Sequence, residues 1–108
     1  METKQLNREK IWGEFRTLLR ETATKLSITV SEDTLSVFEV TRSAPTERKV
    51  LLNFKAPYDH CFVHIEEGQS KTVRQFSFQQ DGHIKWQGEI TEMSQEDAAK
   101  KIMKFLAN

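Results

Sequence analysis

The 108-residue chain is long enough for one folded domain and too short for separate catalytic and regulatory domains. Apolar residues make up 37% of the chain and charged residues 30%, a composition that disfavours both disorder and membrane insertion. Sixteen basic side chains balance sixteen acidic ones, so no global field attracts nucleic acid or anionic lipid. We therefore expect a single α+β domain over residues 1–108, in which any electrostatic function depends on a local patch.

Cysteine usage and the N-terminal residues predict a cellular location. Cys61 is the one cysteine, so it has no intramolecular disulfide partner, and the chain opens with charged rather than apolar residues. Both features favour a reducing, cytoplasmic environment. The apolar runs are far shorter than the roughly 20 residues that a transmembrane helix needs, so no membrane segment is expected.

A helix is predicted over residues 11–26. Apolar residues recur there at helical spacing and form one stripe at about 100° per residue. The stripe consists of Ile11, Trp12, Phe15, Leu18, Leu19, Ala23 and Leu26.

From residue 27 to about residue 90 the hydrophobic period falls to two, and β-branched and aromatic residues become frequent. This pattern predicts an antiparallel meander of five or six strands. The first two strands are expected at 28–30 and 35–42, with a turn at 31–34.

The next two strands are expected at 49–56 and 60–66. Aligning their apolar faces pairs Ala56 with Cys61 and Phe54 with Val63.

The last hairpin turns near Gly82. A two-residue loop would mix apolar and polar faces, whereas a three-residue loop places Phe78 beside Ile84 and Phe76 beside Trp86. The longer loop is predicted, with Gly82 in the left-handed conformation.

A second helix is predicted over residues 95–106, with Ser94 capping the amide of residue 97. Two helices and one apolar sheet face make a two-layer fold: N-terminal helix, antiparallel meander, C-terminal helix. The helix-covered face is expected to consist of Val50, Leu52, Phe54, Cys61, Val63, Ile65, Phe76, Phe78, Ile84 and Trp86. Trp12 and Trp86 are expected to meet in this core.

The opposite sheet face is then left open. It is polar, with a few apolar residues among amides and imidazoles, as antiparallel sheets permit. Its predicted members are Leu51, Asn53, Lys55, His60, Phe62, His64, Val73, Gln75, Ser77, Gln79, Lys85 and Gln87. The predicted partner-binding residues are Leu51, Lys55, His60, Phe62, His64, Val73, Gln75 and Lys85.

Catalytic and cofactor motifs are not found in the sequence. The glycines, at positions 13, 68, 82 and 88, are too far apart for a phosphate-binding loop. On a strand, His60 and His64 point away from the face that carries Cys61, so neither activates the thiol. The two imidazoles are separated by roughly 13 Å of strand, too far for one zinc ion. No catalytic, cofactor or metal residue is predicted, and the chain is not expected to be an enzyme.

Arg74 has two interpretations. Its place on the Phe76 side of the strand allows its stem to lie on apolar surface with its head in water. The alternative is an anion anchor between sheet and helix.

The sequence favours a non-enzymatic interaction module, adaptor- or chaperone-like, that forms a homodimer through the open sheet face or an edge strand. One alternative is a sheet that binds single-stranded nucleic acid through Phe62, Lys55 and Lys85. Another is a small-ligand or enzymatic crevice between helices and sheet.

Overall fold

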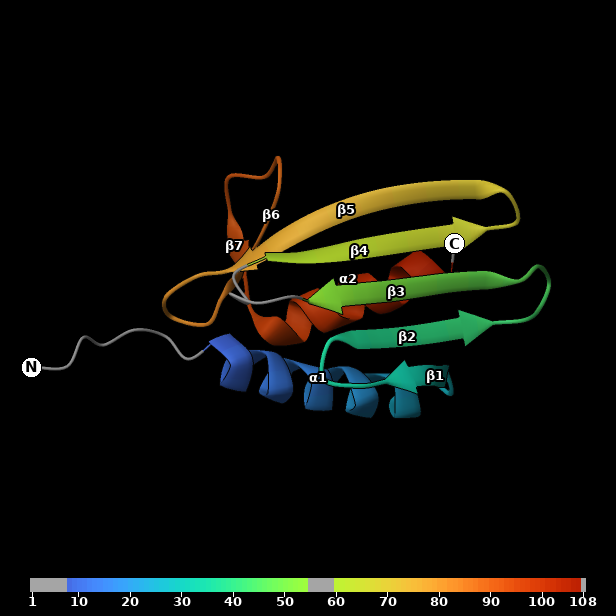
Figure 1. The fold of residues 1–108 in the computed structure, drawn as a ribbon, viewed down its shortest axis with the longest axis horizontal. Helices are drawn as coiled ribbons and strands as arrows, with labels where there is room; N and C mark the ends of the chain where they lie inside the picture. Colours follow the sequence, from blue (N-terminus) through green and yellow to red (C-terminus); the bar gives the residue numbers. More distant parts are fainter. Residues whose placement is uncertain (1–7, 55–59, 108) are drawn as a thin grey trace, which may run out of the picture.

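The computed structural model describes residues 8–54 and 60–107. A helix, a meander of strands and a second helix follow one another along the chain (Figure 1). The elements are α1 (Arg8–Lys25), β1 (Thr29–Asp33), β2 (Val37–Arg42), β3 (Arg48–Phe54), β4 (His60–Glu67), β5 (Ser70–Phe78), β6 (Ile84–Trp86), β7 (Glu92–Met93) and α2 (Gln95–Ala107).

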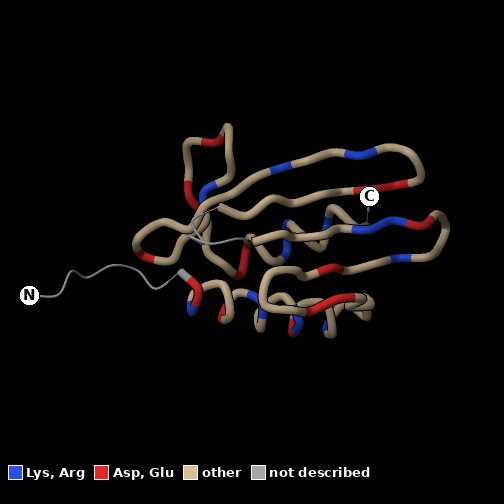
Figure 2. Tube along the Cα trace, in the orientation of Figure 1, with Lys and Arg blue, Asp and Glu red and all other residues tan. Residues whose placement is uncertain are grey.

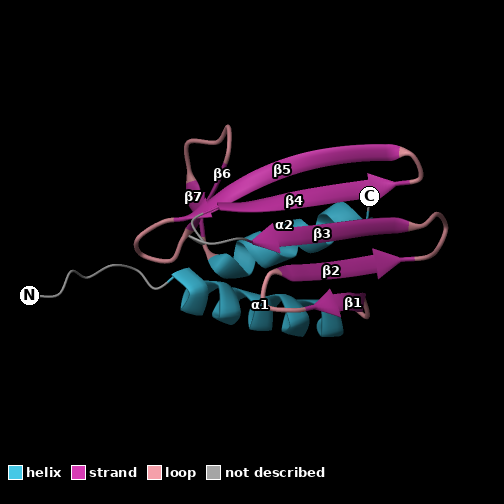
Figure 3. Cartoon of the chain, viewed as in Figure 1, coloured by secondary structure: helices cyan, strands magenta, loops and turns pink. Residues whose placement is uncertain are grey.

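The strands form one antiparallel sheet in sequence order, and both helices lie on the same side of it (Figure 3). The predicted α+β fold is therefore confirmed, although the sheet has seven strands instead of five or six. The additional strand is β7, whose two residues are too few to show a period in the sequence. Neither helix in the described ranges has the length and apolarity needed to cross a bilayer.

The first strand differs from the prediction. It was expected at 28–30 with a turn from residue 31, but β1 continues to Asp33. The register shifts between Val30 and Glu32, which accommodates the irregular stretch without ending the pairing with β2. The polar residues 31–34 predicted a turn, but the bulge lets the first three of them remain in the strand.

The predicted register of β3 and β4 is wrong by two residues. Phe54 pairs with Cys61, and Leu52, rather than Phe54, pairs with Val63. A shift of two preserves the faces, so the apolar sides still coincide. The turn and Ala56 lie outside the described residues.

The predicted register of the last hairpin is confirmed. Phe78 pairs with Ile84 and Phe76 with Trp86. The amide of Gln79 donates to His83 O at 2.7 Å, which closes the loop. Gly82 has a φ of 88°, the left-handed conformation that glycine adopts without a steric penalty.

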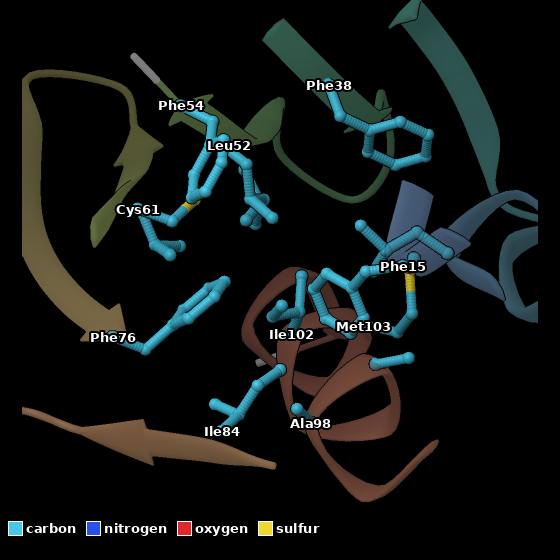
Figure 4. Close-up of a cluster of buried hydrophobic side chains, with 14 of the residues drawn as sticks. Phe15, Phe38, Leu52, Phe54, Cys61, Phe76, Ile84, Ala98, Ile102 and Met103 are labelled. Atoms are coloured by element: carbon cyan, nitrogen blue, oxygen red, sulfur yellow. The ribbon is translucent and has the colours of Figure 1, made fainter. Parts of the chain in front are cut away.

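The core lies between the sheet and the two helices (Figure 4). All the predicted residues of the covered face are buried except Ile65, which is partly buried. Trp12 and Trp86 belong to the same core, linked through Phe15 and Phe76: successive ring centroids are 6.3, 5.8 and 5.1 Å apart. Aromatic packing therefore joins α1 to the far strands of the sheet.

Polar contacts help to fix both helices. The Ser94 hydroxyl accepts a hydrogen bond from the amide of Asp97 at 3.1 Å, so the predicted cap of α2 is confirmed. On α1, Arg16 and Arg20 form ion pairs with Asp33 of β1 at 2.8 and 2.7 Å. These contacts hold α1 across the edge of the sheet.

Candidate functional site: the open sheet face and the β5 edge

A small apolar patch lies in the middle of the open face. The register aligns Leu51 of β3 with His64 of β4 and Val73 of β5. In the next row Phe62 is aligned with Gln75. Phe62 and Val73 are 45% and 52% exposed, whereas Cys61 and Val63, on either side of Phe62 in β4, are buried against the helices. We call Leu51, Phe62, His64 and Val73 the sheet patch.

The other predicted site residues surround this patch. His60 is aligned with Ser77, and Ser77 with Lys85, so both predicted residues lie in one row beyond Phe62. Lys55 lies outside the described residues. The structure thus brings together every predicted partner-binding residue that it describes.

Charged side chains of both signs border the patch on its other side. Glu66 of β4 lies between Lys49 and Lys71 in the sheet register. Glu39 of β2 is aligned with Leu51. Figure 2 shows the acidic and basic positions interspersed along these strands rather than gathered by sign. A border with charges of both signs is better suited to binding another protein than to binding a polyanion such as nucleic acid.

The edge of the sheet at β5 is the second feature of this site. β5 has nine residues, but only Phe76–Phe78 are paired with β6. The residues from Ser70 to Arg74 are all exposed. In Figure 1 this part of β5 forms the free upper margin of the sheet.

The backbone pattern shows which groups are free at this edge. Gln75 O accepts a hydrogen bond from the amide of Gln87, so the backbone groups of Gln75 point away from β4. In an antiparallel ladder alternate residues point the same way. The N–H and C=O groups of Lys71 and Val73 therefore point outward, and no described strand pairs with them.

The opposite edge, at β1, is protected in ways that β5 is not. The bulge between Val30 and Glu32 interrupts β1, and Arg16 and Arg20 of α1 reach over to Asp33. Bulges, charges and covering elements are the usual means of blocking an edge strand. β5 has a regular ladder with β4 along its length and only Lys71 and Arg74 as charges.

Cys61 lies on the covered side, as predicted. Its side chain is buried, and burial raises the pKa of the thiol well above its ordinary value. A neutral, inaccessible thiol is a poor nucleophile. His60 and His64 are on the other face, so they do not activate it.

Arg74 lies over the Phe105 ring of α2 rather than in an anion-binding site between sheet and helix. Its guanidinium carbon is 5.6 Å from the centre of the Phe105 ring, a cation–π contact, and the residue is exposed. This agrees with the interpretation in which the stem follows apolar surface and the head stays in water.

One group of potential metal ligands escaped the sequence analysis. The ligand atoms of Asp81, His83 and Glu92 lie within 4.8 Å of one another, on the β5–β6 loop and β7. All three are exposed, and His83 Nδ1 is 3.2 Å from Asp81 Oδ2. The contact with His83 lowers the pKa of Asp81, chiefly through the His83 amide that donates to its carboxylate. Asp81 and His83 are thus in contact with each other in a solvent-exposed loop.

The free edge of β5 is the feature that sequence analysis missed. A signal was present: the strand after Gly82 reaches only Gln87 before Gly88, which has a φ of 91°. A hairpin partner that ends there cannot cover the first residues of β5.

The chain matches no protein-family model, no curated protein and no solved structure. The arguments for its function therefore come from the geometry of the sheet face and of the β5 edge.

Proposed function

We propose that this chain is a non-enzymatic, cytoplasmic interaction module that forms a homodimer through the β5 edge and binds a protein partner on the open sheet face. The observation that carries the proposal is the exposed backbone of Ser70–Arg74 beside the sheet patch. An edge of this kind is a template for a further antiparallel strand.

A second copy of the chain fits this edge. With a two-fold axis at Thr72, Lys71 of one copy lies opposite Val73 of the other, and the two residues exchange their outward backbone hydrogen bonds. Thr72 of one copy is then directly opposite Thr72 of the other, in a non-hydrogen-bonded pair. No like charges are directly opposite in this register, because Arg74 faces Ser70.

Pairing in this way would align the two open faces. A two-fold axis perpendicular to the sheet keeps both sets of helices on one side. The two sheet patches would lie on the other side, with Val73 of each copy at the seam. The dimer would offer one wide surface with apolar residues at its centre and charges of both signs around them.

Protein is favoured over single-stranded nucleic acid as the partner. Binding of single strands uses several stacked rings in a basic groove. Among the described residues, Phe62 is the one exposed aromatic side chain on this face, and acidic residues are interspersed with basic ones. A mobility shift with single-stranded DNA or RNA at low salt, weakened by Lys85→Glu, would contradict the choice of protein.

A cysteine at the two-fold axis tests the dimer directly. In a Cys61→Ser background, Thr72→Cys places two thiols in a non-hydrogen-bonded pair, where Cα atoms are about 4.5 Å apart, a distance that a disulfide spans. We expect rapid oxidation to a covalent dimer at micromolar protein concentration. Thr34→Cys, in the loop between β1 and β2, is the matched control and should stay mainly monomeric on a non-reducing gel. Equal crosslinking of the two variants would reject the interface.

Two variants of Val73 separate the backbone from the side chain. Val73→Pro removes an outward N–H without taking a donor from the β4 ladder, so it should abolish the dimer in light scattering. Val73→Ala keeps the N–H and should retain most of the dimer. A strict monomer in the wild-type protein at high concentration would overturn the proposal.

Partner binding is tested separately. Phe62→Glu places a charge in the middle of the sheet patch and should abolish capture of a binding protein while the dimer persists. Undiminished capture by this variant would contradict the role of the face.

A further inference from the structure

A long groove lies on the helical side of the molecule, away from the sheet patch. It has a volume of about 1320 Å³ and runs between the last turns of α1, the length of α2 and the ends of β1 and β2. Its apolar lining consists of Leu18 and Ile28, which are partly buried, and Met103 and Leu106, which are almost fully buried. At its rim Leu26 is 55% exposed. The apolar floor of the groove is therefore reached by solvent mainly at Leu18, Leu26 and Ile28.

Lysines border this floor. Lys25, Lys100 and Lys104 line the groove, are exposed, and form no ion pair with any described residue. Lys100 and Lys104 are four residues apart on α2, so their like charges face the same side of the helix and repel each other. An anion between them would relieve this repulsion.

The lining also includes three acidic residues and one arginine. Glu96 and Asp97 are in the first turn of α2, and Glu47 is in the loop after β2. Arg42 is engaged: its Nη1 donates to Leu106 O at 2.8 Å and ties the end of α2 to the sheet. Along α2 the two lysines therefore follow an acidic first turn and form the basic part of this side of the groove.

We propose that the groove binds a single-chain anionic amphiphile, such as a fatty acid anion, with its head group at Lys100 and Lys104 and its alkyl chain on the apolar floor. The lining follows α2 from Glu96 to Leu106, a rise of about 15 Å, and continues onto the ends of α1, β1 and β2, so it extends beyond the two lysines. The lysine stems add apolar surface beside the chain while their ammonium groups meet the head group. This site is independent of the β5 edge.

Calorimetric titration with dodecanoate below its critical micelle concentration tests the proposal. We expect saturable binding and a higher melting temperature, because the ligand binds the folded state. Dodecyltrimethylammonium has the same alkyl chain with the opposite charge and should bind at least about tenfold more weakly.

The variant Lys100→Glu/Lys104→Glu should weaken dodecanoate binding at least about tenfold. The control, Lys49→Glu/Lys85→Glu, makes the same change in net charge on the open sheet face and should bind as the wild type does. Binding that is insensitive to Lys100→Glu/Lys104→Glu, or equal for both amphiphiles, would overturn the site. So would a melting temperature that falls on titration. Absence of saturable binding would also overturn it.

Discussion

Two phenylalanines on neighbouring strands lie close together in the sheet but on its opposite faces, and their environments differ. Phe76 of β5 pairs with Cys61, points into the core and is 1% exposed; Phe62 follows Cys61 on β4, points outward and is 45% exposed. Phe76 contacts the rings of Phe15, Phe78 and Trp86. The same residue type thus stabilises the fold on one face and is available for a partner on the other.

The largest expected effect comes from truncating these two rings. Phe76→Ala leaves a cavity among aromatic rings and should lower the free energy of unfolding by about 3–5 kcal/mol. Phe62→Ala loses only partial burial and should cost less than about 1 kcal/mol. Urea denaturation of the two variants measures the difference. If both variants lose similar stability, Phe62 is as important to the packing of the fold as Phe76, and the two faces do not differ in this respect.

Thiol reactivity compares the same two faces without removing a ring from the core. Native Cys61 should resist a disulfide reagent at pH 8, because burial both covers the thiol and raises its pKa. A thiol on the open face, Phe62→Cys in a Cys61→Ser background, should react at least about a hundredfold faster. Release of the reagent's chromophore gives both rates. Comparable rates would mean that Cys61 is exposed by local opening of the covered face.

Substitution of Ser94 measures how much the N-terminal cap of α2 contributes to the stability of the fold. Ser94→Ala removes the acceptor for the amide of Asp97 and should cost about 1 kcal/mol of unfolding free energy. Ser94→Asp, which can accept the same bond, is the control and should restore most of the stability. Unfolding midpoints in urea that are equal for all three proteins would show that the cap contributes nothing.

The smallest effect is expected at the sheet margin, where Glu67 accepts a hydrogen bond from the Thr46 hydroxyl at 2.6 Å and forms ion pairs with Arg48 and Arg42. The Thr46 hydrogen bond, followed by the charge of Arg48, lowers the pKa of Glu67 below its ordinary value of 4.5. Because the folded state binds this proton less tightly than the unfolded state, Glu67 stabilises the fold above the ordinary pKa. That contribution is lost as the pH falls through the lowered pKa.

Glu67→Gln should therefore have a slightly lower melting temperature than the wild type at pH 7. Its melting temperature should also fall less than that of the wild type between pH 5 and pH 3. Thermal unfolding followed by circular dichroism at several pH values measures this. Glu66→Gln removes the neighbouring carboxylate on the open face and controls for net charge. If the melting temperature of Glu67→Gln changes with pH as it does in the wild type, Glu67 does not contribute to the pH dependence of stability.

The sequence alone determined which side chains share a face. Alternation in β3, β4, β5 and β6 predicted the buried set correctly except for Ile65, which is partly buried, because the pleat of a strand leaves no other arrangement of neighbouring side chains. The same constraint made the register around Gly82 predictable, since the alternative loop would have mixed the faces. It also placed seven of the eight predicted partner-binding residues on one surface; the eighth, Lys55, lies outside the described residues.

Tertiary structure decided what alternation does not specify. A shift of two residues between β3 and β4 leaves both faces unchanged, so hydrophobic pattern could not choose Cys61 over Val63 as the partner of Phe54. The free edge of β5 depends on where β6 stops, and the groove beside Lys100 depends on how α1, α2 and the strand ends pack together. Faces are local properties of a strand, whereas edges and grooves depend on contacts between segments distant in sequence.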